Sequence, residues 1–381
     1  MSMRREVVFV GMSGGVDSSV AAFLLKKQGY DVVGVFMRCY NLDGCAEQDA
    51  EDARRVAGHI GIPFYVWDFE EEYKRRVVEY MVEGYRAGIT PNPDVMCNKE
   101  IKFGLFLEKA LAMGADFVAT GHYVRAGIRA RAKRYEVGGR GGGRKIETRL
   151  FAAKDANKDQ SYFLWTLTQK QLAHCRFPIG GYLKPDVRKI ARRAGLPTAE
   201  KKDSQGICFL GKVSMDEFLK EYIPEKRGAL LTTFGEKIGE HFGAEFYTIG
   251  QRHINADFDF PKTGGRADRE PLYVAAKDAA TNTVVVAEGS DNEALYRKEI
   301  ELTNANFIGG NAPSADASMP VFARVRYRQP LAKAVLRSSG ERRNNGWTLI
   351  FDEPQKFVAP GQSAVWYSKA GEMLGGGIIL G

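Results

Sequence analysis

Near the start of the chain, a short apolar run leads directly into a loop rich in glycine and serine. The run is Val7–Val10, and residues 11–19 read Gly-Met-Ser-Gly-Gly-Val-Asp-Ser-Ser before a helical pattern begins. Glycine allows the backbone to approach an anion closely, and the free N–H groups and dipole at a helix start favour negative charge. The loop therefore predicts a phosphate-binding site. It has neither the lysine of a GxxxxGK[ST] loop nor the GxGxxG spacing of a dinucleotide-binding fold.

The alternation of strand and helix continues after this loop. Further apolar runs at Val32–Met37, Phe64–Trp67 and Phe117–Thr120 are typical of strands, and segments with apolar residues at helical spacing lie between the first of them. Near-continuous apolar strands separated by helices indicate an α/β fold with a doubly wound parallel sheet. Such a sheet binds its ligand at the carboxyl ends of its strands.

The second half of the chain has a different texture. Beyond about residue 210 the helical periodicity fades, and short β-like runs separated by glycine and proline replace it. A chain of 381 residues has room for two or three domains. We expect a catalytic domain over residues 1–212, a small central domain over 213–296 and a C-terminal β-barrel domain over 297–381.

Two segments rich in arginine are candidates for contact with phosphate groups. A strand over Val321–Arg328 would place Arg324, Arg326 and Arg328 on one face, either as a solvated row or as a phosphate track. Of the net charge of +8, most lies between residues 125 and 149, where nine basic residues against two glutamates leave +7. That segment is either a solvated surface hairpin or an arm that contacts phosphates. Its basic residues are Arg125, Arg129, Arg131, Lys133, Arg134, Arg140, Arg144, Lys145 and Arg149.

Apolar run length and cysteine spacing argue against two classes of protein. No apolar run approaches the roughly 20 residues of a membrane-spanning helix. The five cysteines contain no CxxC pair, so a disulfide framework is not expected. We expect a protein that is neither membrane-spanning nor secreted and that works in the reducing cytoplasm. Cys39, Cys45 and Cys175 fit a structural or incidental role.

The SGGVDSS string over residues 13–19 resembles the pyrophosphate-binding loop of the PP-loop ATP pyrophosphatases. The resemblance implies ATP as cosubstrate, activation of a carbonyl as its adenylate, and release of pyrophosphate. It does not fix the substrate. Mg²⁺ is expected to accompany the ATP phosphates, and no dedicated metal site is visible in the sequence.

Two cysteines stand in polar surroundings that favour a thiolate. Cys97 follows a double-proline turn at what looks like a helix start, close to Lys99, so the helix dipole and the lysine would both stabilise negative charge. Cys208 lies in a glycine-containing loop after Lys201 and Lys202. Either cysteine alone is more typical of a small buried apolar residue. The presence of an adenylating loop in the same sequence favours a reactive role for both cysteines.

Seven motifs together resemble the MnmA-type tRNA-specific 2-thiouridylases, in the expected order and essentially from end to end. They are SGGVDSS, TPNPDxxCNxxIKF, ATGHY, NKDQSYFL, KKDSxGICF, RYRQ and PGQSAV. The resemblance implies a tRNA-uridine 2-sulfurtransferase that adenylates the 2-carbonyl of the wobble uridine in tRNAs for lysine, glutamate and glutamine. Sulfur from a donor such as a cysteine desulfurase or a relay protein then replaces AMP. The wobble base has to leave the anticodon stack to reach the site.

The resemblance also implies roles for individual residues. Cys208 carries the persulfide, and Cys97 attacks it to free sulfide or closes a disulfide with Cys208. Asp94 either positions the base and moves a proton or only caps a turn. The ATP site comprises Gly11, Met12, Ser13, Gly14, Gly15, Val16, Asp17, Ser18, Met37 and Gly121. The tRNA-contacting positions are Asn92, Pro93, Asp94, His122, Lys158, Asp159, Gln160, Arg326, Tyr327 and Gln362.

Three alternatives remain open at this point. A PP-loop ligase that uses ammonia on a small metabolite would need neither cysteine. An RNA-binding sulfur carrier that holds nucleotide only for regulation would release no pyrophosphate in response to tRNA. A labile iron–sulfur cluster involving Cys97 and Cys208 would replace the persulfide route.

Overall fold

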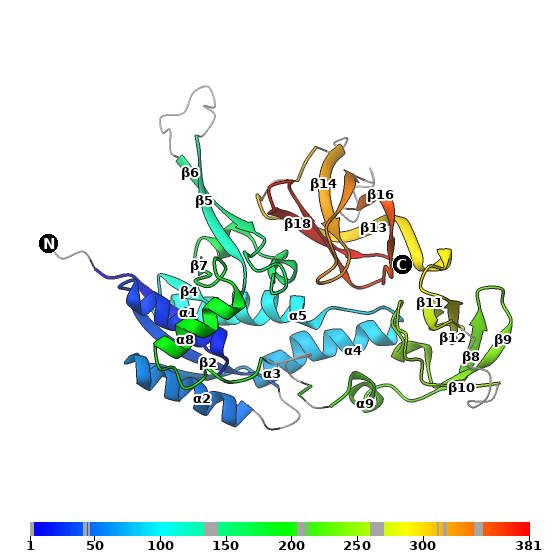
Figure 1. Cartoon of the computed structure of the whole chain (residues 1–381), viewed down its shortest axis with the longest axis horizontal. Coiled ribbons are helices and arrows are strands. Elements are labelled where there is room, and N and C mark those ends of the chain that lie inside the picture. The colour runs from blue at the N-terminus through cyan, green and yellow to red at the C-terminus, as the bar shows by residue number, and fades with distance from the viewer. Residues whose placement is uncertain are drawn as a thin grey trace.

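The computed structural model describes residues 4–40, 44, 46–132, 144–203, 210–211, 213–259, 270–310, 312–314, 318–338 and 346–381. Three sheets organise the chain: a parallel sheet near the N-terminus, a mixed sheet in the middle and an antiparallel barrel at the end (Figure 1). The fold predicted from the sequence is confirmed. The exact domain boundaries stay a prediction. None of the described helices is long and apolar enough to cross a membrane.

The first sheet has five parallel strands in the order β3-β2-β1-β4-β7. Val8 and Val10 pack into one buried cluster with α1, α2 and α8, whereas Phe9 packs into another cluster with helices on the opposite face. The sheet is therefore doubly wound, as the apolar strands predicted. The elements are β1 (Val7–Gly11), α1 (Val16–Lys27), β2 (Asp31–Arg38), α2 (Ala46–Ile60), β3 (Phe64–Asp68), β4 (Phe117–Ala119), β7 (Cys175–Arg176) and α8 (Lys184–Arg193).

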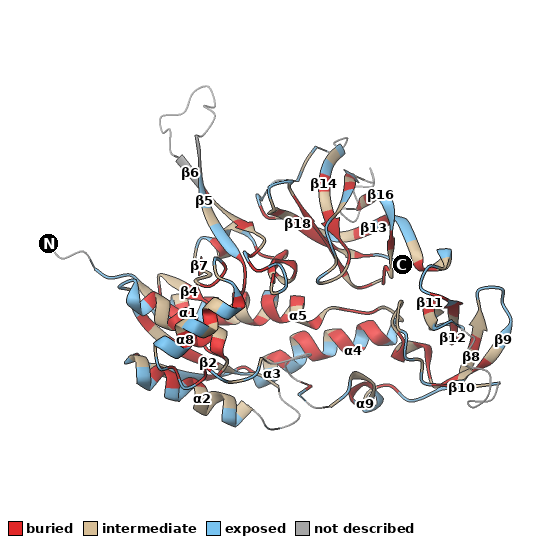
Figure 2. Cartoon of the chain, viewed as in Figure 1, coloured by how far each residue is buried: buried red, intermediate tan, exposed pale blue. Residues whose placement is uncertain are grey.

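Two long helical segments cover the second face of this sheet and extend beneath the barrel (Figure 1). Buried residues run along the first of them between the lobes of the molecule (Figure 2). Each segment joins α-helical and π-helical turns without a break. The first comprises α3 (Glu70–Tyr73), the π-helical η1 (Lys74–Val78) and α4 (Glu79–Arg86), and the second comprises α5 (Pro93–Met96), the π-helical η2 (Cys97–Leu105) and α6 (Phe106–Ala112).

The second helical segment begins earlier than the sequence analysis expected. Asn92 is its N-cap, because the Asn92 side chain accepts a hydrogen bond from Val95 N at 3.2 Å, and Pro93 is the first helical residue. Cys97 is therefore the fifth residue of the helix and does not lie at its start. The expectation that the helix dipole acts on Cys97 from the first turn is wrong, since the dipole effect falls off within that turn.

The central region forms a five-stranded sheet in the order β10-β9-β8-β12-β11. Its pairs are antiparallel except for the parallel pair of β12 with β8. The region has α9 (Met215–Lys220), β8 (Gly228–Thr232), β9 (Lys237–His241), the 3-10 turn η4 (Ala244–Phe246), β10 (Ala256–Phe258), β11 (Leu272–Asp278), β12 (Thr283–Glu288) and the 3-10 turn η6 (Glu293–Leu295).

The C-terminal strands close into an antiparallel barrel, because β13 pairs with both β16 and β18. Its core contains Leu302, Leu349 and Trp366. The elements are β13 (Tyr296–Phe307), β14 (Ser318–Arg324), β15 (Ala332–Ser338), β16 (Trp347–Lys356), β17 (Ser363–Tyr367) and β18 (Glu372–Ile379). Loops and short elements from the catalytic region pack beneath it, among them the 3-10 turn η3 (Ser161–Leu164) and α7 (Gln169–Leu172).

The basic segment forms a hairpin of β5 (Arg125–Ala132) and β6 (Arg144–Phe151) that projects from the body of the molecule (Figure 1). Its base joins the barrel sheet, because Phe151 and Leu150 pair with Glu372 and Met373 of β18. Residues 133–143 lie outside the described part of the chain. The hairpin form agrees with both interpretations of its charge.

The proposed row of arginines does not exist. Strand β14 ends at Arg324, and Arg328 has a φ of 64°, so the alternation stops before Arg326. Arg324 is buried at 6% exposure and forms an ion pair with Asp159 at 2.7 Å. Strand alternation predicted an exposed side chain at Arg324, but this partner lies in a segment 165 residues away in the chain.

Candidate nucleotide and sulfur-transfer site

The glycine-rich loop connects the carboxyl end of β1 to the start of α1. Gly15 is the N-cap of α1 and offers no side-chain hydrogen bond to it, so the first N–H groups are not capped by that residue. Ser18 Oγ accepts from Ser13 N at 3.1 Å and holds the loop closed. Gly14 has a φ of 70°, and a Cβ there would lie 2.3 Å from the Asp49 carbonyl oxygen. Glycine is required at this position.

Met37 and Gly121 lie against the same loop. A Cβ added to Gly121 would lie 2.7 Å from Ser18 N, so this turn packs directly on the start of α1. A Cβ added to Gly11 would lie 2.9 Å from Met37 Cε. The structure thus brings together the loop, the end of β2 and the turn after β4. The predicted role of these residues in ATP binding is consistent with this placement.

An ion-pair cluster behind the loop includes residues that the sequence analysis missed. Lys184 Nζ lies 2.8 Å from both carboxylate oxygens of Asp17 and 2.8 Å from Asp203 Oδ1. Asp203 also pairs with Lys158 and Arg188, each at 2.7 Å. No local pattern marks Lys184 in the sequence, because its partners are distant in the chain.

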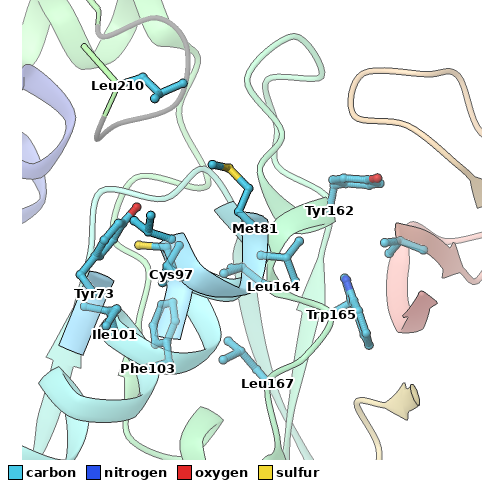
Figure 3. Packing of buried hydrophobic residues seen from close by; sticks show 14 of the residues in the cluster. Tyr73, Met81, Cys97, Ile101, Phe103, Tyr162, Leu164, Trp165, Leu167 and Leu210 are labelled. Carbon is cyan, nitrogen blue, oxygen red and sulfur yellow. The ribbon is translucent and has the colours of Figure 1, made fainter. Parts of the chain in front are cut away.

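Cys97 is 7% exposed and belongs to a buried apolar cluster with Tyr73, Ile101 and Phe103 (Figure 3). The ammonium group of the nearby Lys99 is paired with Glu100 at 3.1 Å. That pairing reduces the effect of Lys99 on the thiol. The thiol of Cys97 is therefore shielded by apolar side chains, and its predicted catalytic role requires access from within the site.

Cys208 lies outside the described residues, and so does Cys45. Leu210, two positions after Cys208, is buried in the same apolar cluster as Cys97 (Figure 3). Lys201 does not supply the free positive charge that the sequence analysis expected near Cys208, because its ammonium group binds Asp49 and Asp52 at 2.6 Å each.

Cys39 and Cys175 were expected to have a structural or incidental role. Burial raises the pKa of Cys175 to about 12, which agrees with a structural role for this thiol. Cys39 is partly exposed. Within the described ranges, no group of three or more His, Cys, Asp or Glu side chains is placed to hold a metal ion.

Asp94 precedes Cys97 by three residues, so the two side chains share one side of the helix. Burial raises the pKa of Asp94, and the charge of Lys102 opposes that shift. Burial also holds the pKa of His122 well below its ordinary value, with Lys102 acting in the same direction. Lys102 is thus a cation near both groups, and the sequence analysis did not single it out.

His122 is itself enclosed by protein. Its Nδ1 lies 2.7 Å from Thr120 Oγ1, and its ring centroid lies 5.9 Å from that of Phe103. The imidazole is 7% exposed in this conformation. Its predicted contact with tRNA stays a prediction and needs a local rearrangement.

The loop before Pro93 meets the end of the barrel. Gln362 Nε2 donates to Thr90 O at 2.9 Å, and Thr90 N donates to Pro360 O at 2.8 Å. Asn92 Nδ2 also reaches Gln362 Oε1, at 3.4 Å. Asn92 and Gln362 are two predicted tRNA-contacting positions, and they are neighbours although 270 positions separate them in the chain.

Four more predicted positions make contacts within or between the catalytic domain, the central region and the barrel. The ring of Tyr327 packs against that of Phe163 with centroids 4.6 Å apart, and Arg326 donates to Ile249 O at 2.6 Å. Lys158 lines a cavity of about 270 Å³ together with Arg328. Gln160 Oε1 accepts from Tyr123 N at 3.0 Å.

Asp159 differs from its neighbours. Its side chain is buried, accepts hydrogen bonds from Ala153 N and Ser161 N, and pairs with Arg324. Both of its carboxylate oxygens bind protein groups, so the side chain fixes the turn that carries Lys158 and Gln160. A direct contact of Asp159 with tRNA stays a prediction.

Three family models match successive parts of the chain. A tRNA methyl transferase HUP domain matches residues 6–212, a tRNA methyl transferase PRC-barrel domain matches 216–288, and an aminomethyltransferase beta-barrel domain matches 297–379. The fold and the loop therefore define a HUP-domain protein with two appended β domains.

Relatives with assigned names are similar along the whole chain. The chain is 45% identical over 377 residues to tRNA-specific 2-thiouridylase MnmA 2 of Geobacillus kaustophilus, which covers 98% of this chain and 94% of the relative. It is 47% identical over 378 residues to tRNA-specific 2-thiouridylase MnmA of Thiobacillus denitrificans, with 98% and 99% covered. The chain belongs to the MnmA family of tRNA-specific 2-thiouridylases, which confirms the resemblance seen in its motifs. Among solved structures, a 4-thiouridine synthetase–RNA complex with bound ATP has a TM-score of 0.33 and 15% identity, covering 57% of this chain and 50% of that one.

Proposed function

We propose that this protein is an ATP-dependent tRNA-uridine 2-sulfurtransferase that thiolates the wobble uridine of tRNAs for lysine, glutamate and glutamine. The observation that carries the proposal is the similarity at 45% identity over 98% of the chain to a tRNA-specific 2-thiouridylase. The glycine-rich loop at the carboxyl end of β1 supports it, because this edge is where such sheets bind ligands. We place the reaction in the cytoplasm, where tRNA and reduced thiols are both present.

ATP is required because a carbonyl oxygen is a poor leaving group. Adenylation of the uridine 2-oxygen turns it into the oxygen of AMP, which leaves readily. The N–H groups at the start of α1 and the loop over residues 11–18 would hold the phosphates, and Met37 and Gly121 would lie beside the nucleotide. Mg²⁺ would arrive on the ATP phosphates, since Asp17 is already engaged by Lys184 and Tyr123.

The sulfur atom would come from a persulfide on Cys208, loaded by a donor protein. In one route, the Cys97 thiolate attacks the inner sulfur of that persulfide, which gives a Cys97–Cys208 disulfide and hydrosulfide. Hydrosulfide then adds to C2 of the adenylated uridine and displaces AMP, and a thiol reductant reopens the disulfide before the next turnover. In the other route, the terminal sulfur of the persulfide attacks C2 and displaces AMP, and the Cys97 thiolate then attacks the Cys208 sulfur, which releases 2-thiouridine and forms the same disulfide.

Asp94 supports proton transfer near the base. Burial raises its pKa, so the carboxyl group holds a proton at a higher pH than an exposed aspartate does. Asn92, Pro93 and Gln362 would contact the tRNA near the extruded base, while His122, Lys158, Gln160, Arg326 and Tyr327 would contact it elsewhere. The contact of catalytic loop and barrel at Asn92 and Gln362 supports a shared RNA surface.

A reconstitution with purified protein, ATP, tRNA and a persulfide donor tests the proposal. We expect 2-thiouridine by nucleoside mass spectrometry and pyrophosphate release that depends on tRNA. Cys208→Ser is expected to abolish 2-thiouridine and to retain pyrophosphate release, whereas Cys175→Ser retains both. Sulfur incorporation by Cys208→Ser would reject the persulfide route. Absence of tRNA-dependent pyrophosphate release would favour a sulfur carrier, and adenylation of a small metabolite would favour an ammonia-using ligase.

A further inference from the structure

We propose that Arg328 and Lys158 together bind one phosphate group of the RNA backbone, in a cavity between the catalytic domain and the barrel. The inference rests on the proposed function, because it takes tRNA as the RNA, and it adds Arg328 and Asn157 to the residues that contact it. The cavity has a volume of about 270 Å³ and is lined by Ala156, Asn157, Lys158 and Arg328. A water molecule takes up about 30 Å³ in the liquid, so the cavity has room for a phosphate group.

Arg328 has a strained backbone conformation. Its φ is 64°, and Gln329 N donates to Arg326 O at 3.3 Å, so Arg328 is the third residue of a β-turn. Glycine is the usual residue where that position has a positive φ, and a side chain there is strained. Such strained residues persist only where their surroundings hold them, and they cluster at binding sites. The position of this arginine is therefore better explained by its side chain than by the needs of the turn.

Neighbouring residues hold the turn in this form. Val325 N donates to Gln329 Oε1 at 3.0 Å, and Gln329 Nε2 donates to Gln355 Oε1 at 2.9 Å. The guanidinium carbon of Arg328 lies 5.2 Å from the centroid of the Tyr327 ring. This cation–π contact limits the directions that the Arg328 side chain can take.

The charge of Arg328 is available to a ligand. Among the described residues, no carboxylate lies within ion-pair distance of its guanidinium group, and the residue is exposed. A guanidinium group presents five N–H donors in a planar fork that matches two oxygens of a phosphate. Arg328 is therefore suited to bind a phosphate by two parallel hydrogen bonds.

Lys158 supplies a second cation from the catalytic domain. Its Nζ lies 2.7 Å from Asp203 Oδ2, which occupies one of its three N–H donors. Asp203 also binds Lys184 at 2.8 Å and Arg188 at 2.7 Å. One carboxylate is thus shared among three cations, so Asp203 does not neutralise Lys158.

The turn that carries Lys158 is also fixed in place. Asn157 N donates to Asp155 Oδ1, and Lys158 N donates to Asp155 O, each at 3.1 Å. Asp155 Oδ2 in turn accepts from Lys184 N at 2.8 Å. Asn157 is exposed at the cavity, where its amide group adds a neutral donor. Two fixed turns from different domains therefore present their donors to one cavity.

The position of the cavity favours a phosphate of RNA over a phosphate of the nucleotide. None of its four lining residues belongs to the glycine-rich loop over residues 11–19. The rings of Phe163 and Tyr327, with centroids 4.6 Å apart, lie beside Arg328 and provide the kind of aromatic surface on which RNA bases stack. Phosphate contacts fix the register of a nucleic acid on a protein. A phosphate bound here would fix the RNA to the catalytic domain and the barrel at once.

The salt dependence of tRNA binding tests the site in the full-length protein. Binding of a lysine tRNA transcript is measured at several salt concentrations. We expect Arg328→Gln to bind several-fold more weakly than the unmodified protein. If both cations bind the same phosphate, the double variant Arg328→Gln with Lys158→Gln should make the plot of log affinity against log salt concentration less steep by about 0.7–0.9 in total. Arg337→Gln on β15, an exposed arginine of the same domain, should leave the slope unchanged.

Twice that loss of slope in the double variant would mean two separate phosphates and would overturn the single site. Arg328→Gly separates binding from folding, because glycine removes the charge and relieves the strained φ. We expect its Tm to be at or above that of the unmodified protein and its tRNA affinity to fall as in Arg328→Gln. An unchanged salt slope in both Arg328 variants overturns the inference.

Calorimetry with inorganic pyrophosphate and with α,β-methylene-ATP distinguishes the source of the phosphate. We expect Arg328→Gln to bind both as the unmodified protein does. Weaker binding of either one with unchanged tRNA affinity would assign the cavity to the nucleotide and overturn the inference. A protein that shows the change in slope but does not thiolate tRNA would refute the proposed function and leave the phosphate site intact.

Discussion

Asn92 and Gln362 meet across the boundary between catalytic domain and barrel, with Asn92 Nδ2 3.4 Å from Gln362 Oε1. The contact places the N-cap of the helix that carries Cys97 directly against the barrel. Under the proposed function, the barrel would therefore influence how this helix presents Asp94 and Cys97 to the tRNA.

Gln362→Ala is expected to raise the KM for tRNA several-fold and to leave ATP binding unchanged. The variant loses hydrogen bonds to Thr90 and Pro91, each of which contributes about 1 kcal/mol. Steady-state thiolation at varied tRNA checks this expectation. Gln28→Ala, at the exposed end of α1, is the control. An unchanged KM in Gln362→Ala would show that this contact has no part in tRNA binding.

Gly14→Ala is expected to abolish measurable ATP binding. A positive φ costs a residue other than glycine about 1–2 kcal/mol, and here the new Cβ would also collide with the Asp49 carbonyl group. Gly29→Ala is a matched control, because its φ is +94° and its Cβ would meet no atom within 4 Å. We expect it to lose stability and to retain ATP binding by calorimetry. Equal ATP affinity in both variants would contradict the placement of nucleotide in the loop.

Asp94→Asn is expected to change the pH dependence of stability. Burial raises the pKa of the folded carboxyl group above its unfolded value, so the native state binds the proton more tightly than the unfolded state does. That contribution to stability is present at low pH and is lost as the pH rises through the raised pKa. The Tm of Asp94→Asn relative to the unmodified protein should therefore increase between pH 4 and pH 8. A difference for Asp94→Asn that falls with pH would contradict the burial of this group.

The basic hairpin is expected to contact RNA. Trypsin should cleave within residues 125–149 more slowly when tRNA is present, and equal cleavage in both states would count against a binding role. Arg129 is exposed. If Arg129→Gln loses a phosphate contact, the plot of log affinity against log salt concentration should become less steep by about 0.7–0.9. Arg54→Gln on α2 is the exposed control.

Local sequence patterns predicted the parallel sheet well, since apolar runs and the glycine-rich loop are contiguous signals. The start of the helix at Pro93 was missed although Asn92 and Pro93 form a recognisable cap. Arg324 is buried because it pairs with Asp159, and Lys184 pairs with Asp17, which lies 167 positions away in the chain. Tertiary packing decides such pairings, and the periodic pattern of apolar residues in the sequence does not predict them.

Mass spectrometry of wobble uridine in tRNA from a strain lacking this gene tests the central claim most directly. We predict that 2-thiouridine disappears from the lysine, glutamate and glutamine tRNAs. The unmodified gene should restore it, and Cys208→Ser should not. 2-Thiouridine at its normal level in the deleted strain would contradict the account.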